Sequence, residues 1–175
     1  MNALTELELQ PAEQLYTALK EAVQAALTPQ TVVLGIHSGG AWLSERLARD
    51  LQLQGRVGSI SSSMYRDDFA KRGLAQSLPT DIPFDINGAQ VMLIDDVLYT
   101  GRTIRAVLNE LFDYGRPATV QLMVLVDRAG RHLPFAANFA AAQADLAAEN
   151  SLNLIKNADG SLQFALKTRE ASHAE

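Results

Sequence analysis

The sequence predicts an α/β fold, with a mostly parallel, twisted sheet flanked by helices. Two observations indicate this class. Several apolar, β-branched runs are continuous rather than alternating, as expected of strands buried on both faces. These runs alternate with segments whose apolar residues recur at helical spacing, and the alternation continues from residue 31 to 126. Strands connected in this way lie parallel and are joined by right-handed crossovers, with helices over both faces.

The first elements follow from periodicity and turn residues. Helical spacing of leucine, valine and alanine, with a proline near each end, predicts an amphipathic helix over 11–28. The apolar run 31–36 predicts a buried strand. Leucines at helical spacing then predict a helix through about residue 54, and residues 57–65 predict a second strand.

The middle of the chain contains an irregular segment. Residues 66–83 are polar and charged, without a sustained period, and predict a long loop or a loose hairpin. Loops of this length usually serve as functional lids or are disordered. The apolar run 91–94 predicts a third strand that stops at two adjacent aspartates. A helix over 102–114 and a strand over 120–126 complete the alternating region.

The pattern changes after residue 127. Residues 136–148 are rich in alanine and weakly patterned, whereas 152–155 and 162–166 predict short strands around a turn. The length of 175 residues and the 47% apolar content suit one domain. We expect a core of about 28–130 that contains a mobile loop at about 66–83. A small hood would follow at about 131–168, to which the N-terminal segment is a further candidate contributor.

Composition excludes several classes of chemistry. The absence of cysteine excludes disulfides, thiolate metal sites and a cysteine nucleophile. No run approaches the ~20 apolar residues of a membrane span, and the first residues carry acid where a secretory signal carries base. We therefore expect a cytoplasmic protein without a membrane partner. The net charge of −5 comes from the two ends, because residues 31–131 hold eleven charges of each sign. The middle region can thus bind an anionic small molecule or a polynucleotide.

The strongest chemical signal is the string Asp95-Asp96-Val-Leu-Tyr-Thr-Gly-Arg-Thr103, because ligands of open α/β sheets bind at the carboxyl ends of strands. Two carboxylates can accept hydrogen bonds from sugar hydroxyls. The helix N-terminus that follows, with Thr100 and Thr103, offers donors to a phosphate. A sugar phosphate is the predicted ligand. The aspartate pair alone also fits a strand end without chemistry, or a phospho-acceptor receiver domain.

The complete string resembles the phosphoribosyl-diphosphate (PRPP) signature of type I phosphoribosyltransferases. It is most similar to the version found in PyrR proteins, which regulate pyrimidine operons and double as uracil phosphoribosyltransferases. Further similar segments occur in the family order at comparable spacing: Gly35 to Gly40, Tyr65 to Asp68, Gly115 to Pro117 and Leu125 to Arg128. The resemblance covers about residues 31–135 and implies the type I phosphoribosyltransferase fold.

The resemblance also implies the roles of individual residues. Asp95 and Asp96 would bind the PRPP ribose hydroxyls, directly or through the water shell of Mg²⁺, and with Arg66 they are the candidate catalytic residues. No dedicated protein cage for Mg²⁺ is expected, since the ion would bind through PRPP with these aspartates nearby. The candidate PRPP-binding residues are Asp95, Asp96, Val97, Leu98, Tyr99, Thr100, Gly101, Arg102 and Thr103.

Two further groups of residues are implied. The pyrophosphate loop would bind through its backbone N–H groups and consists of His37, Ser38, Gly39 and Gly40. Asp127 and Arg128 would lie on the base side. Arg66, which opens the mobile loop, would cover pyrophosphate together with Lys71 and Arg72 when that loop closes.

The chain departs from the family pattern in two places. Gly39 stands where the family commonly has a basic residue, and residues 140–146 replace a Gly-Lys-Asn-x-Pro-Thr stretch of the hood. The main prediction is a PyrR-like bifunctional protein, which makes UMP from uracil and PRPP and regulates pyrimidine gene expression. The alternatives are a nucleotide- or PRPP-sensing regulator with little or no catalysis, and a phosphoribosyltransferase for another base.

The expected partners follow from the same resemblance. They are PRPP, uracil, UMP and a second copy of the chain, as a homodimer or higher homo-oligomer. A pyrimidine-operon leader RNA is also implied, but helices 41–54 and 102–114 both mix acidic with basic residues. We therefore expect RNA affinity to be weak or confined to a small patch.

Overall fold

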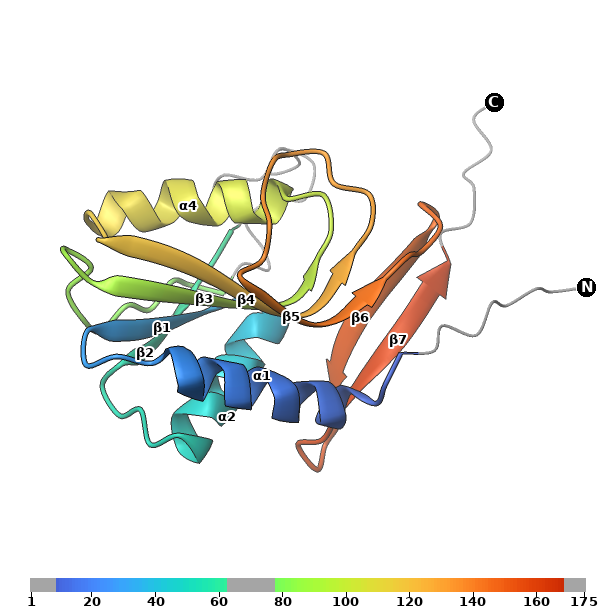
Figure 1. Ribbon diagram of the computed structural model, residues 1–175, viewed down its shortest axis with the longest axis horizontal. Coiled ribbons are helices and arrows are strands. Elements are labelled where there is room, and N and C mark those ends of the chain that lie inside the picture. Colours follow the sequence, from blue (N-terminus) through green and yellow to red (C-terminus); the bar gives the residue numbers. More distant parts are fainter. Residues whose placement is uncertain (1–8, 63–77, 169–175) are drawn as a thin grey trace, which may run out of the picture.

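Five parallel strands form the centre of the molecule (Figure 1). The computed structural model describes residues 9–62 and 78–168. The strands of the sheet, which lie in the order β2-β1-β3-β4-β5, are β1 (Thr31–Ile36), β2 (Val57–Ile60), β3 (Gln90–Leu98), β4 (Thr119–Arg128) and β5 (Phe139–Ala144). This arrangement confirms the predicted α/β class.

Helices cover both faces of the sheet (Figure 1). Helices α1 (Ala12–Ala26) and α2 (Gly39–Asp50) lie on one face, and α4 (Arg102–Tyr114) lies on the other. The continuous apolar run of β3 explains this layering, because Met92 and Ile94 join the core beneath α1 and α2, whereas Val91 and Leu93 join the core beneath α4. None of the described helices is long and apolar enough to cross a membrane.

Helix α1 agrees with its predicted range to within two residues at each end. Pro11 stands at the N-cap with a φ of −51°, a value that suits helix entry. Leu15, Leu19 and Val23 recur every four residues and are almost fully buried. The apolar stripe read from the sequence is therefore the face that packs against the sheet.

Helix α2 ends earlier than the sequence predicted. Its last residue is Asp50, whereas the leucine spacing suggested continuation to about residue 54. Gln52 adopts a left-handed φ of 54°, and the N–H of Leu53 donates to the carbonyl of Ala48. Leu53 is buried in the core beneath the helix without belonging to it. The leucine spacing correctly predicted that Leu53 is buried. The residue reaches the core through a turn and not through a continuation of the helix.

The prediction that β3 stops at the two aspartates is wrong. The strand continues to Leu98, because β4 continues to Arg128 and supplies pairing partners for Val97 and Leu98. Asp95 itself pairs with Val124. The carboxylates therefore project from a hydrogen-bonded ladder rather than from a loop, which fixes their backbone.

Strand β5 was assigned to the hood but joins the main sheet. Its alanine-rich sequence has little intrinsic preference for a strand. Asn138 holds its start: the amide carbonyl oxygen of its side chain accepts from the N–H of Leu122, and its own N–H donates to the carbonyl of Leu122, each at 2.8 Å. The segment 131–168 is thus divided between the main sheet and a separate hairpin.

That hairpin consists of β6 (Asn150–Lys156) and β7 (Leu162–Thr168), which pair antiparallel as predicted. The turn between them is closed by Asp159, whose Oδ1 accepts from the N–H and the hydroxyl of Ser161. Leu152, Leu154 and Leu162 are buried in the core beneath α1 and α2. The hairpin therefore packs onto the main domain through one apolar face.

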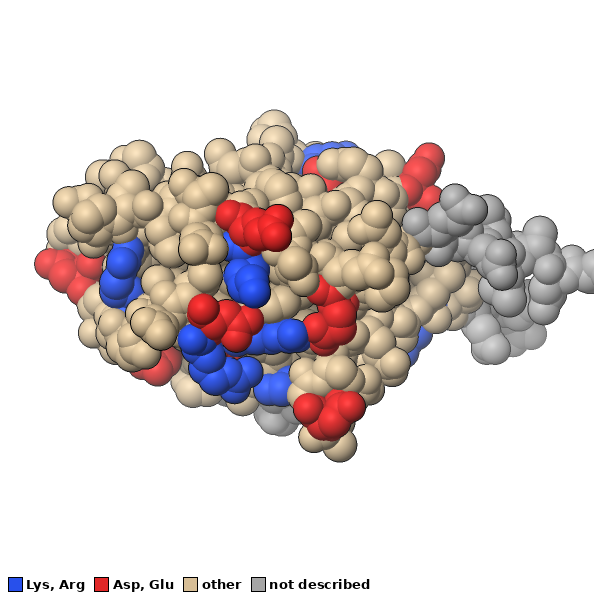
Figure 2. All heavy atoms as spheres, turned by 60° about the horizontal axis from the view of Figure 1, so that its bottom comes forward, with Lys and Arg blue, Asp and Glu red and all other residues tan. Residues whose placement is uncertain are grey.

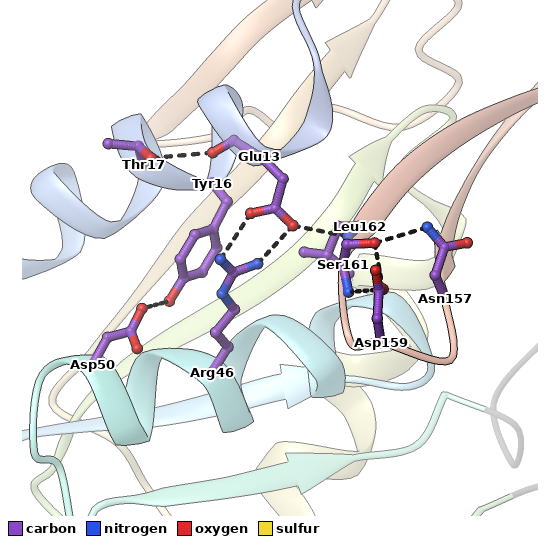
Figure 3. A network of polar contacts seen from close by, with 9 residues as sticks. All are labelled: Glu13, Tyr16, Thr17, Arg46, Asp50, Asn157, Asp159, Ser161 and Leu162. Atoms are coloured by element: carbon purple, nitrogen blue, oxygen red, sulfur yellow. Dashed lines mark hydrogen bonds and ion pairs between the residues drawn. The ribbon is translucent and has the colours of Figure 1, made fainter.

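A polar network fixes the hairpin to both helices of that face (Figure 3). The carboxylate of Glu13 on α1 pairs with Arg46 on α2, at 2.9 Å from Nη1 to Oε1 and 2.7 Å from Nη2 to Oε2. Oε1 of Glu13 also accepts from the N–H of Leu162 at 2.8 Å. The Arg46 guanidinium lies 4.1 Å from the centre of the Tyr16 ring, whose hydroxyl donates to Asp50 at 2.7 Å. One carboxylate thus joins α1, α2 and β7.

This network predicts an effect of Glu13→Gln on stability. Hydrogen bonding to Arg46 lowers the pKa of Glu13 from its ordinary value despite partial burial. A lowered folded-state pKa contributes stability above the unfolded value of about 4.3, and the contribution is lost as pH falls through the folded pKa. Because the Glu13 side chain is 40% exposed, solvent screening limits the expected loss at pH 7 to about 1 kcal/mol.

Urea unfolding between pH 7 and pH 2 measures this difference. Glu149→Gln, at an exposed position of the same charge type, is the matched control. The gap between the two variants should shrink as the pH falls below about 4.3. Equal stability of both variants at pH 7, or a gap independent of pH, would contradict the prediction.

Candidate functional site

A cavity of about 410 Å³ lies at the carboxyl ends of β1 and β3, where ligands of open α/β sheets bind. It is bounded by the start of α2, the end of β3, the start of α4 and strand β6. The described residues that line it are His37, Ser38, Gly39, Trp42, Asp95, Asp96, Val97, Tyr99, Thr103, Arg128, Ala148, Asn150, Ser151, Leu152, Asn153 and Leu154.

Two glycines bring the N-terminus of α2 against β3. A Cβ atom on Gly40 would lie 2.1 Å from the carbonyl oxygen of Ile94, and one on Gly39 would lie 2.6 Å from Oδ2 of Asp96. A side chain at residue 40 would collide with backbone, and one at residue 39 would have to displace the Asp96 carboxylate. The preceding peptide bond, between His37 and Ser38, is cis. The unpaired N–H groups and partial positive charge of the first turn of α2 therefore lie next to a carboxylate at the cavity wall.

The two aspartates are adjacent in β3, so their side chains start on opposite faces of the strand. Asp95 is 7% exposed, and its Oδ1 accepts from the N–H of Asp96 at 2.9 Å. Asp96 faces Gly39 on the α2 side. Both still line the cavity, because it opens at the sheet edge where the two faces meet. The site thus presents two carboxylates beside a helix N-terminus.

The residues after β3 form the second helix N-terminus of the site. Gly101, with a φ of 88°, caps α4, and the carbonyl of Thr100 accepts from the N–H groups of His132 and Leu133. Thr103 in the first turn of α4 lines the cavity. Backbone hydrogen bonds from the segment after β4 therefore fix the loop between β3 and α4.

The predicted PRPP-binding residues divide into three groups. Val97, Tyr99 and Thr103 line the cavity together with the two aspartates. Leu98 is buried in the core beneath α4, so only its backbone is available. The third group, at the entry of α4, does not contribute to the described cavity wall and comprises Thr100, Gly101 and Arg102.

The candidate base-side residues have different environments. Arg128 is 2% exposed, and its guanidinium lies 3.8 Å from the centre of the Tyr99 ring. It donates to the carbonyls of Asn150 at 2.7 Å, Leu146 at 3.1 Å and Ala147 at 3.2 Å.

Asp127, by contrast, pairs with Arg131 and lines a second cavity of about 380 Å³, which Arg128 also borders. Arg66, the third candidate catalytic residue, lies outside the described residues, as do Lys71 and Arg72.

The sequence interpretation missed part of the wall. Trp42, which lies one turn into α2, and residues 150–154 of β6 face the cavity. The strand over 152–155 was predicted from the sequence, and its leucines are buried in the core. Nothing in the sequence indicated that this strand would lie opposite Asp95 and Asp96.

Comparison with known proteins decides the family. The model described as "Phosphoribosyl transferase domain" matches residues 8–141. A protein of Ralstonia nicotianae named "Bifunctional protein PyrR" is 47% identical over 168 residues, which cover 93% of this chain and 96% of that protein. A protein of the same name from Nitrosococcus oceani is 41% identical, with 87% of each chain covered. The chain belongs to the PyrR family of phosphoribosyltransferases.

Solved structures support the same fold. A hypoxanthine phosphoribosyltransferase of Trypanosoma cruzi superimposes with a TM-score of 0.59 at 26% identity, covering 80% of this chain and 82% of that one. The cavity of this PyrR-family chain therefore lies in a phosphoribosyltransferase fold. Its phosphoribosyltransferase activity follows from the family.

The packing of Gly39 predicts the effect of Gly39→Ala. The added Cβ would displace the Asp96 carboxylate from its position beside α2. We expect PRPP binding, measured by calorimetry, to weaken about ten-fold, equivalent to about 1.4 kcal/mol.

Gly88→Ala is the control for this variant, because φ there is +71° but a Cβ would meet no atom within 4 Å. It should lose stability and keep its PRPP affinity. Unchanged PRPP affinity in a folded Gly39→Ala variant would show that Asp96 does not depend on this packing.

Proposed function

We propose that the protein is a uracil phosphoribosyltransferase that forms UMP and pyrophosphate from uracil and PRPP, and that it also regulates pyrimidine biosynthesis genes. One observation carries the catalytic part. Asp95 and Asp96 share a single cavity with Gly39 at the start of α2 and with Thr103 in the first turn of α4. This pairs acceptors for sugar hydroxyls with two sets of donors for phosphate groups.

The arrangement suits displacement of pyrophosphate at the anomeric carbon. A ring nitrogen of uracil forms the new bond to this carbon as the bond to the pyrophosphate oxygen breaks, and the ring nitrogen's proton is lost. N–H groups at the start of α2 would stabilise the charge that develops on pyrophosphate, while the aspartates hold the ribose. The start of α4, with Thr103, would bind the 5-phosphate.

The donor set also fits Mg²⁺. Among the described residues, no cluster of three or more histidine, aspartate and glutamate side chains is arranged to hold a metal. Mg²⁺ commonly binds through one or two carboxylates together with substrate phosphates and waters. Asp95 and Asp96 are the residues that would hold it, and when bound it would neutralise charge on pyrophosphate.

Strand β6 is the proposed wall around the base. Asn150, Ser151 and Asn153 are polar residues of this strand that line the cavity together with Val97. An asparagine amide offers both a donor and an acceptor, as the imide edge of uracil requires. In this proposal these residues take the role of the Gly-Lys-Asn-x-Pro-Thr stretch that the family has in its hood. The choice of base is therefore the first point that experiment must test.

The aspartate pair yields the central prediction. In Asp95→Asn/Asp96→Asn, the amides keep the shape of both side chains but remove the negative charge that would hold Mg²⁺ and ribose. UMP formation from PRPP and uracil with Mg²⁺ should fall at least about 100-fold, while Glu149→Gln retains activity. Turnover by the double variant at the wild-type rate would refute the assignment.

The same assay tests the base. PRPP is supplied in turn with uracil, orotate, guanine or hypoxanthine, and the wild-type protein should turn over uracil fastest. Faster turnover of another base would redefine the enzyme. UMP binding without turnover of any base would identify a sensor and refute the catalytic proposal.

A further prediction concerns how strongly the protein binds RNA. Arg46 pairs with Glu13, and Lys156 lies 3.8 Å from Glu45. Figure 2 shows basic and acidic side chains interspersed on one face of the molecule, without an extended basic surface there. Filter binding to a pyrimidine-operon leader RNA should therefore show weak affinity. A steeply salt-dependent, submicromolar affinity would contradict this prediction.

The proposal includes assembly as a homodimer or higher homo-oligomer in the cytoplasm. The family resemblance supports it. Light scattering of the purified protein tests the assembly directly, and a monomer at micromolar concentration would count against it.

A further inference from the structure

Arg128 carries a charge and lines the cavity, yet its side chain is almost fully buried. It is 2% exposed, and a charge at this depth is costly unless its hydrogen bonds are satisfied. Its guanidinium donates to the carbonyls of Leu146, Ala147 and Asn150. These carbonyls belong to the segment that leads into β6. Both Nη groups of Arg128 are therefore bound to backbone, whereas its buried Nε has no hydrogen-bond partner in the described part of the protein.

The other contact of Arg128 is with the loop that follows β3. One face of its guanidinium lies against the Tyr99 ring, 3.8 Å from the ring centre. The same ring approaches Gly130, where a Cβ would lie 2.5 Å from Cε2 of Tyr99. Arg131 donates to the carbonyl of Tyr99. Tyr99 is thus held by three residues of one short segment.

These two contacts connect two segments that line the same cavity. Tyr99 precedes α4, and residues 150–154 belong to β6. Arg128 lines this cavity and also borders the second one, which contains Asp127. It therefore borders both cavities, and its contacts connect the loop before α4 with the segment that leads into β6.

We propose that Arg128 is a positioning residue: it sets the separation of β6 from the loop that contains Tyr99, and thereby the width of the site for the nucleobase. The kinetic consequence rests on the proposed function, whereas the structural consequence does not. Lysine cannot replace it, because an ammonium group lacks the planar fork that stacks on a ring while donating to several carbonyls.

Hydrogen–deuterium exchange of the ligand-free full chain tests the structural consequence. In Arg128→Lys, amides of residues 146–154 and 99–103 should exchange at least about ten-fold faster than in the wild type. Arg116→Lys is the matched control, because Arg116 lies over the Phe112 ring at 5.6 Å and donates to a backbone carbonyl at an exposed site. It should leave exchange in both segments unchanged.

Steady-state kinetics supplies the second measurement. Arg128→Lys should raise the KM for the nucleobase about ten-fold and lower kcat by a smaller factor. Tyr99→Leu serves as a second variant in case Arg128→Lys fails to fold. It removes the stacking partner of Arg128 and leaves the charge in place, and it should accelerate exchange in residues 146–154.

The outcomes separate the possibilities. A raised KM with unchanged exchange in the ligand-free protein would mean that Arg128 contacts the base directly, which overturns the proposal. Unchanged exchange together with unchanged kinetics also overturns it. If the wild type turns over no base, the proposed function fails, and the exchange result alone still decides the role of Arg128.

Discussion

The close approach of Gly39 and Gly40 to the end of β3 is the constraint on which the site depends. Atoms of Ile94 and Asp96 occupy the space that side chains at these two positions would need. The helix that starts there can therefore direct its N-terminal N–H groups to the carboxylates of β3. Both helix entry and strand end are fixed by hydrogen-bonded structure, so the polar groups face each other without further ordering.

Gly39 also marks a departure from the family pattern. A basic side chain at this position would have to pass through the space that Asp96 occupies. Next to it lies His37, whose ring nitrogens are buried and have no hydrogen-bond partner in the described part of the protein. In the proposed function, backbone N–H groups at the start of α2 would therefore bind the pyrophosphate without a basic side chain at residue 39.

The hairpin β6–β7 is attached to the core at two separate places. Glu13 and Arg46 hold its far end at Leu162, whereas Arg128 holds the segment that enters it. Between these points Leu152 and Leu154 bury their side chains. The polar side of the same strand is then free to face the cavity, because its apolar side already determines how the strand lies.

Much of this could be predicted from the sequence, and the failures in β3 and β5 share one cause. Helix α1, strands β1 and β4 and the hairpin follow from local patterns, and Asp95, Asp96 and the glycine pair follow from a motif. The extension of β3 depends on pairing with β4, and β5 depends on Asn138 and Leu122 rather than on its alanines. The burial of Arg128 depends on Tyr99, which lies far away in the chain. Local patterns do not report such partners.

Trp42 has a consequence for spectroscopy. The sequence contains one tryptophan, and it lies on the cavity wall between the glycine pair and strand β6. Its emission therefore comes from a single, known environment. Any molecule that enters the cavity changes the polarity around one indole, so the protein carries its own fluorescent reporter of occupancy and needs no label.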